Sequence, residues 1–309
     1  MTTTHLFLHL KRPVSTPAAA RRSRMTWTQR IRHLVQFGFA AFILYSSVQH
    51  NLATEDGTTA SMDALCPFGA IETAWRFISQ GQFLSHIHLS SLVLGIGVLL
   101  SVLLVGGAFC GWICPFGAVM DLMNWLRTRL HLREVQVSAR WDRILRYGRY
   151  LMLGIILYQT IATVTLWFGG IDPYRTLFGL EWLFAFNPAA NWVAYTIVLV
   201  VLGSSLFIER AWCRYACPFG GAIRLLGNLS LLRICREGDA CKGCAVCARP
   251  CPVKLPVESA NTISSNCIGC LACVDACPRP GALEVKLAPA WLDPFHKLFA
   301  RKAEVSHAR

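Results

Sequence analysis

The chain has 309 residues, of which 54% are hydrophobic and 15% are charged, and its mean hydropathy is +0.43. These values are typical of a membrane protein and exclude an ordinary soluble domain. The net charge of +13 would favour nucleic-acid binding on a soluble protein. Here the basic residues flank apolar stretches, so we interpret them as topology signals and expect no nucleic-acid partner.

Residues 1–28 are predicted to form a basic, disordered cytoplasmic tail. They are rich in Ser, Thr, Pro and Ala and contain no acidic residue. No cleavable signal peptide is recognisable. Met25 lies just before the first apolar stretch and is an alternative start of the protein.

Four uncharged stretches define a predicted transmembrane domain over residues 29–228. A helix needs about 20 apolar residues to cross a bilayer, so each stretch is interpreted as one span. Basic residues gather before the first span and after the second, whereas the loops 50–88 and 168–190 carry one Arg each. Because basic loops stay in the cytoplasm, we expect a multi-pass protein of the bacterial inner membrane with both termini in the cytoplasm. The spans cover residues 34–48 (extending toward 54), 89–109, 150–167 and 192–207.

The transmembrane domain contains an internal repeat. Each half has a span, an outer loop with a Pro-aromatic turn, a second span and an inner Cys-x3-Cys-Pro motif. The first motif contains Cys110 and Cys114, and the second contains Cys213 and Cys217. If the motifs are helical, the two cysteines of each lie on one face. The repeat is parallel, so an axis along the membrane normal would bring the two motifs together at the inner face.

The four cysteines of these motifs have two candidate roles. They could ligate an additional Fe–S cluster, or they could form two reversible dithiol/disulfide pairs. Simple burial as small apolar side chains is the structural alternative, and the duplication of the whole motif argues against it. Cys66, alone in the first outer loop, is a weaker redox candidate, and Cys235 is expected to be an idle thiol.

Residues 229–285 contain two copies of Cys-x2-Cys-x2-Cys-x3-Cys-Pro. This is the run of bacterial ferredoxins, in which two copies hold two [4Fe–4S] clusters and the fourth cysteine of each run ligates the other cluster. Structural zinc would leave the third cysteine and the proline of each run unexplained. The predicted ligands are Cys241, Cys244, Cys247 and Cys277 for one cluster, and Cys267, Cys270, Cys273 and Cys251 for the other.

The predicted fold class is therefore an α-helical integral membrane protein with a C-terminal α+β domain of the 2[4Fe-4S] ferredoxin type. Four transmembrane helices form two parallel two-helix repeats, and residues 286–309 form a basic amphipathic or disordered tail. The basic side chains of Lys242, Arg249 and Lys254 are candidates for raising the cluster potentials, or are solvated surface. Trp112 and other tryptophans near span ends are interpreted as an aromatic belt at the membrane interface.

The combination of four spans, two Cys-x3-Cys-Pro motifs and two ferredoxin runs, over residues 30–285, resembles the NapH/MauN/NosR group of membrane polyferredoxins. The resemblance implies electron transfer between a quinol pool or a cytoplasmic donor and a periplasmic reductase or maturation system. It implies a quinone as a further cofactor and a respiratory subunit as a partner. The chain could then be the membrane subunit of a quinol dehydrogenase, or an electron carrier.

Other functions remain open from the sequence. A redox-sensing or cofactor-maturation accessory protein of a respiratory enzyme would carry the same clusters. A transporter is disfavoured because the spans lack intramembrane acids and bases. The histidines near the first two spans lack the spacing of haem ligands and are interpreted as interfacial anchors, with a quinone site at the last two as an alternative. They are His33, His50, His86 and His88.

Overall fold

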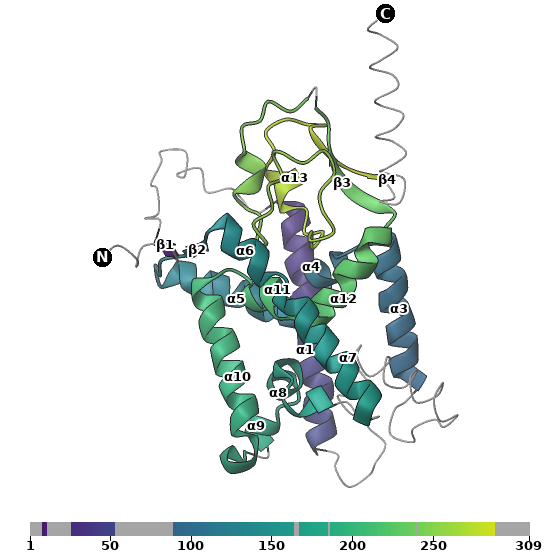
Figure 1. Ribbon diagram of the computed structural model, residues 1–309, viewed down its shortest axis with the longest axis vertical. Coiled ribbons are helices and arrows are strands. Elements are labelled where there is room, and N and C mark those ends of the chain that lie inside the picture. Colours follow the sequence, from purple (N-terminus) through teal and green to yellow (C-terminus); the bar gives the residue numbers. More distant parts are fainter. Residues whose placement is uncertain are drawn as a thin grey trace, which may run out of the picture. The chain divides into compact units, whose positions relative to one another are not determined.

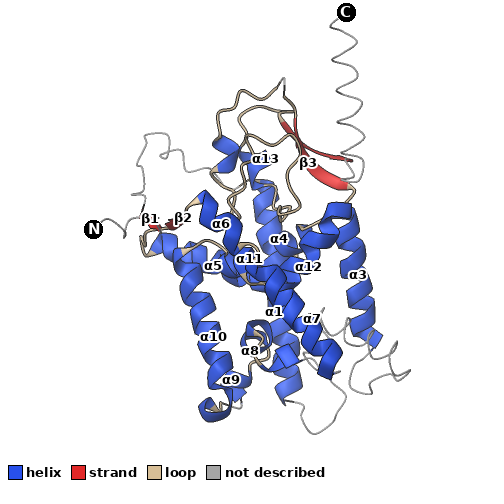
Figure 2. Ribbon diagram, in the orientation of Figure 1, coloured by secondary structure: helices blue, strands red, loops and turns tan. Residues whose placement is uncertain are grey.

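The computed structural model describes residues 8–10, 26–52, 89–163, 167–184, 186–238 and 240–287. Cys66, His86, His88 and the tail from residue 288 onward lie outside the described residues. Contacts divide the chain into two compact units, which we call the helical unit (described residues up to 98, and 113–222) and the cysteine-rich unit (99–112, and from 223 onward). Helices dominate the first unit, and a small sheet belongs to the second (Figures 1 and 2).

The helical unit contains most of the helices. Helices α3 (Leu89–Val105) and α12 (Pro218–Leu226) continue from this unit into the other. A short antiparallel pair joins β1 (Leu8–Leu10) to β2 (Val135–Val137), so residues 8–10 form a strand within the tail that was expected to be disordered. The other elements are α1 (Trp27–Leu52), α5 (Pro115–Arg129), α6 (Ala139–Leu145), α7 (Gly148–Thr163), η3 (Trp167–Gly170), α8 (Pro173–Phe178), α9 (Glu181–Phe184), α10 (Pro188–Phe207) and α11 (Ala211–Tyr215).

Every predicted span corresponds to a helix, but the helices differ in length. Among the residues that the structure describes, α1 and α10 are long and apolar enough to cross a bilayer. Helix α3 has 17 residues and α7 has 16, which is fewer than the roughly 20 residues of a typical span. Helix α3 ends at Val105 because Gly106 has φ = +62°, a left-handed conformation that often ends helices. The helical fold is thus confirmed, whereas the number of four spans stays a prediction.

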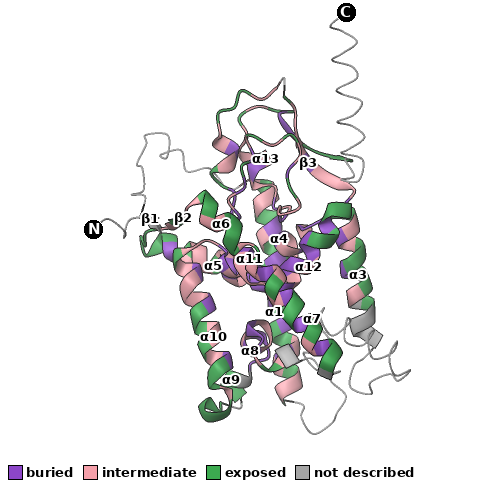
Figure 3. Ribbon diagram, viewed as in Figure 1, coloured by how far each residue is buried: buried purple, intermediate pink, exposed green. Residues whose placement is uncertain are grey.

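Helix α1 buries one stripe of its surface. Its buried residues recur every three or four positions, which places them on a single face. The apolar part of this face, Ala40 and Ile43, packs with Phe116 of α5, Phe178 of α8 and Val201 of α10. The outer faces of α1 and α10 expose large apolar side chains such as Leu34 and Leu199 (Figure 3). An apolar exterior of this extent is expected of helices that contact lipid.

A buried ionic group connects both halves of the repeat. Asp121 of α5 accepts hydrogen bonds from Arg210 Nε and Nη2 at 3.0 and 2.7 Å, and from Arg32 Nη1 at 3.1 Å. The amide of Gln36, oriented to satisfy both its atoms, donates to Asp121 at 3.2 Å and accepts from the Ala118 N–H at 3.1 Å. The side chain of Arg210 is completely buried. One carboxylate therefore neutralises two guanidinium groups that come from segments far apart in the sequence.

The cysteine-rich unit is built around one antiparallel strand pair. Strand β3 (Leu232–Arg236) pairs with β4 (Leu283–Leu287), with Ile234 opposite Val285, so the two ends of the ferredoxin-like segment meet. The remaining elements are α4 (Ala108–Trp112), η4 (Gly227–Leu229), η5 (Val246–Ala248) and α13 (Ala272–Ala276). Buried Ile234, Val253 and Ile268 pack with four of the eight cysteines: Cys247, Cys251, Cys270 and Cys273.

Candidate iron–sulfur centre

The two cysteine runs fold into two copies of the same turn. In the first run Gly243 and Ala245 have φ = +67° and +55°, and their counterparts Gly269 and Leu271 have φ = +61° and +59°. These left-handed residues flank the second cysteine of each run and curl the chain around it. A left-handed alanine or leucine costs roughly 1 kcal/mol or more, and such strain is concentrated at functional sites. The repeated spacing is thus matched by a repeated backbone.

The groups that change the pKa of Cys247 show which cysteines lie near it. Burial raises the pKa of the Cys247 thiol, and the nearby thiols of Cys277 and Cys241 raise it further. Charged groups affect the pKa of a neighbour in this way when they lie close to it. Cys277 is the last cysteine of the second run, so it lies beside cysteines of the first run.

The thiols of the second run have a matching set of neighbours. Burial raises the pKa of Cys267 to about 11, and the nearby Cys270 and Cys251 contribute to this rise. Burial also raises the pKa of Cys273, and the same three thiols add to it. Cys251 is the last cysteine of the first run, so it lies beside cysteines of the second run. Binding of iron to these thiols would release protons, because the thiolate is the metal ligand.

Backbone N–H groups point at several of the sulfur atoms. The N–H of Gly269 donates to Cys267 Sγ at 3.3 Å, and the N–H of Leu255 donates to Cys251 Sγ at 3.4 Å. The backbone of Gly243 likewise hydrogen-bonds to Cys241 and lowers the pKa of its thiol. Donors of this kind favour the thiolate, so the local backbone is prepared for ligands that carry negative charge.

Basic side chains of two kinds lie near the cysteines. Of the three predicted candidates, Lys242 and Arg249 are exposed and Lys254 is half-buried. Arg224 of α12 is instead 2% exposed and donates from Nη1 to the Ser265 oxygen at 3.1 Å. Its positive charge opposes the rise that burial causes in the pKa of Cys267. Near Cys241, Arg236 and Arg279 have the same effect on the pKa. These arginines were not predicted as candidates, because each lies outside the cysteine runs.

Replacing Arg224 by glutamine is expected to make the potential of one cluster more negative, by an amount on the order of tens of millivolts. A buried positive charge favours the reduced cluster, which carries one more negative charge. Redox titration followed by EPR measures the shift. Arg249→Gln removes an exposed charge of the same sign and is the matched control. Equal shifts in the two variants would contradict the assignment of Arg224.

The cysteines of the two Cys-x3-Cys-Pro motifs do not lie on continuous helices. Cys110 lies in α4, which ends at Trp112, and Cys114 is the N-cap of α5, which begins at Pro115. Pro218 begins α12 in the same way after the second motif. Two cysteines on one helical face were predicted only for helical motifs, and this condition is not met because each proline starts a new helix in its first turn.

The structure places these cysteines in two environments. Cys114 and Cys213 pack against the same hydrophobic cluster of the helical unit, around Phe116. Cys217 follows in the same unit and accepts from the Gly220 N–H at 3.3 Å. Cys110 belongs to the cysteine-rich unit and packs against its core together with Cys267. Two of the four thiols are thus brought to one core, and Cys110 is brought to the ferredoxin-like core.

A second ionic group holds the second motif. Asp142 of α6 accepts from the Tyr215 hydroxyl at 2.7 Å and from Arg146 Nε at 2.7 Å, and it also pairs with Arg214. Burial and this carboxylate raise the pKa of Tyr215 far above its ordinary value, although the charge of Arg214 opposes the rise. The residues between the cysteines of the second motif therefore anchor α6.

The structure also describes the surroundings of Cys235, His33 and His50, which are predicted from the sequence to be an idle thiol and interfacial histidines. Cys235 lies in β3, opposite Glu284 of β4 and outside both cysteine runs. Its role as an idle thiol stays a prediction. His33 contacts Arg32 and the ring of Phe37, and His50 lies near the end of α1. Within the described ranges, no three His, Cys, Asp or Glu side chains gather tightly enough to hold a single metal ion. A cubane has an iron for each thiolate, so its ligands stand farther apart than those of a zinc site.

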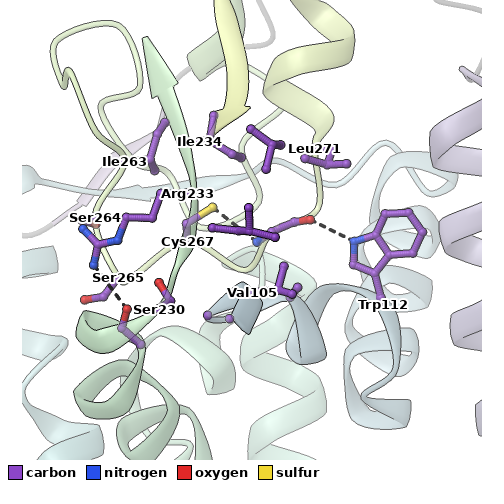
Figure 4. A pocket seen from close by; sticks show the side chains of 17 residues that line it. Val105, Trp112, Ser230, Arg233, Ile234, Ile263, Ser264, Ser265, Cys267 and Leu271 are labelled. Carbon is purple, nitrogen blue, oxygen red and sulfur yellow. Dashed lines mark hydrogen bonds between the residues drawn. The ribbon is translucent and has the colours of Figure 1, made fainter. Parts of the chain in front are cut away.

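A cavity of about 320 Å³ lies within the cysteine-rich unit (Figure 4). Its lining is mainly apolar and includes Val105, Ile234 and Leu271. Arg233 and Cys267 also line it. Cavities of this size hold small organic ligands.

Comparison with family models matches three segments of the chain. Residues 87–133 and 190–234 match one model, described as a 4Fe-4S binding domain. Residues 233–278 match a 4Fe-4S dicluster domain. Each of the first two segments contains one Cys-x3-Cys-Pro motif, and the third contains all eight cysteines of the ferredoxin runs.

The chain is also similar to curated proteins. It is 33% identical to the ferredoxin-type protein NapH of Haemophilus influenzae, over 63% of this chain and 69% of NapH. It is 31% identical to YccM of Escherichia coli, over 66% of this chain and 58% of YccM. It is 30% identical to the regulatory protein NosR of Pseudomonas aeruginosa, over 58% of this chain but 26% of NosR. No solved structure matches the chain.

Proposed function

The chain belongs to the family of ferredoxin-type electron-transport proteins represented by NapH, and from this premise we propose that it is an iron–sulfur electron carrier of the bacterial inner membrane. It relays electrons between a quinol pool or a cytoplasmic donor and a periplasmic reductase or maturation system. The observation that carries the proposal is the grouping of the thiols, in which each run lies beside the fourth cysteine of the other.

The proposed ligands follow this grouping. Cys241, Cys244, Cys247 and Cys277 hold one [4Fe–4S] cluster, and Cys267, Cys270, Cys273 and Cys251 hold the other. The N–H donors to Cys267 and Cys251 support such ligands, because they favour sulfur atoms that carry negative charge. A bound cluster of this kind supplies the transfer of one electron at a time. The protein's own part is to position the ligands and to set the potential through nearby charges such as Arg224.

The membrane location is proposed from α1 and α10 together with the apolar exterior of these helices. Both termini and the cysteine-rich unit face the cytoplasm, in agreement with the basic loops. Clusters on that side cannot carry an electron across about 30 Å of hydrocarbon by themselves. A quinone or a respiratory partner subunit completes the path.

The cavity beside Cys267 is the proposed site for a quinone head group. Its volume of about 320 Å³ and its mainly apolar lining suit a small aromatic ligand, and Arg233 supplies a hydrogen-bond donor. A quinol bound there would lie next to a cluster ligand. This proposal replaces the alternative of a quinone site at His86 and His88, which lie outside the described residues.

The full chain, purified anaerobically in detergent, tests the function. The two clusters of the ferredoxin runs account for about eight irons and as many sulfides per chain, with an EPR signal in the reduced protein, and an additional cluster would bring the iron to about twelve. We expect a quinol analogue to reduce the clusters rapidly. Colourless protein that contains zinc would contradict the cluster proposal. Intact clusters that the quinol analogue does not reduce would rule out the quinol pool as the electron donor.

An additional cluster at the Cys-x3-Cys-Pro motifs is proposed because both motifs lie in segments that match a 4Fe-4S binding domain. Combining Cys114→Ala with Cys217→Ala should then lower the iron content by about four per chain. The control is Cys235→Ala, which removes a thiol outside all the motifs. Iron content equal to that of the unmodified chain would leave the dithiol role for these cysteines.

The second candidate is a redox-sensing or maturation accessory protein. Its support is the similarity to NosR, which is named a regulatory protein. A sensor needs no sustained electron flow. Slow, single reduction of the clusters without turnover would favour this second candidate over the relay.

A further inference from the structure

The geometry points to Trp112 as the positioning residue for the turn that carries Cys267. We infer that its indole N–H fixes this turn and thereby keeps the potential of the adjoining cluster more positive than that of an unsupported turn. The inference rests on the proposed function, because it requires a cluster at Cys267. Trp112 thus has a role that differs from the membrane-interface role predicted for it from the sequence.

Gly269 is held from both sides. The indole Nε1–H of Trp112 donates to the Gly269 oxygen at 2.9 Å. The N–H of the same glycine donates to Cys267 Sγ at 3.3 Å (Figure 4). Any movement of the Gly269 carbonyl therefore also moves the donor that faces the ligand sulfur. Trp112 lies 157 residues earlier in the sequence, so it acts as an external support of the cysteine run.

Three glycines let α4 approach this turn backbone to backbone. A Cβ atom on Gly107 would lie 2.2 Å from the Cys267 oxygen, and one on Gly111 would lie 2.3 Å from the Ile268 oxygen. A Cβ atom on Gly269 would lie 2.9 Å from Ala108 Cα. Real Cβ contacts are not this short, so no larger residue fits at these positions without displacing the backbone. The indole hydrogen bond thus belongs to an extended contact.

Within the part of the chain that the structure describes, the turn of the first cysteine run has no such contact at its glycine. Gly243 has the same left-handed conformation as Gly269, and its backbone also hydrogen-bonds to the first cysteine of its run, Cys241. Yet among the described atoms nothing lies within 4 Å of a Cβ atom placed on Gly243. The two turns therefore have the same internal hydrogen bond and differ in their contact with α4. Any effect of Trp112 should be confined to one cluster.

The second Cys-x3-Cys-Pro motif supplies an internal comparison. Tyr215 occupies the position of Trp112, and Arg214 occupies the position of Gly111. The Tyr215 hydroxyl donates to Asp142 at 2.7 Å, so this aromatic donor serves α6. The aromatic donors at the equivalent positions of the two motifs therefore have different acceptors, and that of Trp112 lies in a cysteine run.

The direction of the effect follows from the charge of the cluster. Reduction adds one negative charge, and N–H donors to the ligand sulfurs stabilise the reduced form and raise the potential. Polarisation along connected hydrogen bonds strengthens each of them. Without the indole donor, the Gly269 carbonyl loses its anchor, the N–H···S bond weakens and the potential falls.

The test is a redox titration of Trp112→Phe in the full chain, followed by EPR, with Tyr215→Phe as the matched control. Both variants remove one aromatic hydrogen-bond donor at equivalent positions of the repeat. We expect Trp112→Phe to shift one of the two midpoint potentials to a more negative value and to leave the other unchanged. Tyr215→Phe should leave both unchanged.

A second pair of variants covers the case in which Trp112→Phe does not accumulate. Gly111→Ala inserts a methyl group against the Cys267 turn, whereas Gly97→Ala adds one where no described atom lies within 4 Å. Gly111→Ala should shift the same single potential, and Gly97→Ala should shift neither. Unchanged potentials in Trp112→Phe, or equal shifts with Tyr215→Phe, would overturn the inference. Absence of clusters from the unmodified chain would instead refute the proposed function.

Discussion

Replacing Asp121 by asparagine is expected to destabilise the helical unit by about 3–5 kcal/mol, the usual cost of leaving a buried charge without its partner. Burial by itself would raise the pKa of Asp121, but Arg210 and Arg32 together hold it below its ordinary value. The carboxylate is thus ionised, and it is shared by two arginines. Asparagine preserves the shape of the side chain and removes the negative charge that two buried guanidinium groups share.

The same group predicts a dependence on pH. A carboxyl group whose pKa is lowered by folding stabilises the folded state fully above the unfolded pKa of about 3.9. This contribution is lost as the pH falls through the lower pKa of the folded state. Asp121→Asn should therefore lower the free energy of unfolding at neutral pH. It should also weaken the fall of that free energy with decreasing pH, because the titrating carboxyl group is gone.

Thermal unfolding in detergent, followed by the fraction that remains monodisperse, measures this loss. A double variant with Asp121→Asn and Arg210→Met separates charge from shape, because it also removes one of the two guanidinium groups and fills its volume with an apolar side chain. The double variant should unfold at a higher temperature than Asp121→Asn alone. An Asp121→Asn protein as stable as the unmodified chain would show that the ionic group does not hold the helices together.

Local spacing made the cysteine chemistry predictable. The ligands of each CxxCxxC triplet are neighbours in sequence, so the chain needs only a tight turn to bring them around one point. The left-handed residues Gly243 and Gly269 form these turns, and both lie just before the second cysteine of a run. The internal repeat was predictable for the same reason, since α4 and α11, each followed by a proline, recur at equivalent positions.

Long-range contacts were beyond sequence reasoning. Trp112 was placed in an aromatic belt because its partner, Gly269, is distant in the chain and offers a backbone oxygen that any residue carries. Arg224 could not be distinguished from the many other arginines, because its importance lies in its burial beside Cys267. Its counterpart in the first half of the repeat is Asp121. Equivalent positions thus carry opposite charges, which no count of basic residues reveals.

The lengths of the spans were predictable only in part. Hydropathy gave the correct helical segments, but it does not detect where a helix ends within an apolar stretch. Gly106 ends α3 before the predicted limit at residue 109, since its φ of +62° is incompatible with continued helix. The same break frees residues 108–112 to form α4, which contacts the Cys267 turn. Gly106, which the sequence does not distinguish from other small residues of a span, therefore helps to form the candidate site.

The proposed exchange of fourth cysteines predicts the second large effect. Cys251→Ala is expected to remove the cluster held by Cys267, Cys270 and Cys273, although Cys251 belongs to the other run. Iron content should fall by about four per chain, and one of the two EPR-detected reduction steps should disappear. Cys277→Ala should remove the other cluster with the same loss of iron. Iron content alone cannot reveal which cluster is lost, so a marker for one cluster is required.

Arg224 provides that marker, because its charge acts on Cys267. If the fourth cysteines are exchanged, Cys251→Ala leaves only the cluster of the first triplet, and adding Arg224→Gln should not change the remaining potential. In Cys277→Ala the cluster near Arg224 survives, and the same addition should lower its potential. An uncrossed arrangement predicts the reverse, since Cys251→Ala would then spare the cluster at Cys267. The sensitivity to one buried arginine thus decides how the two runs share their ligands.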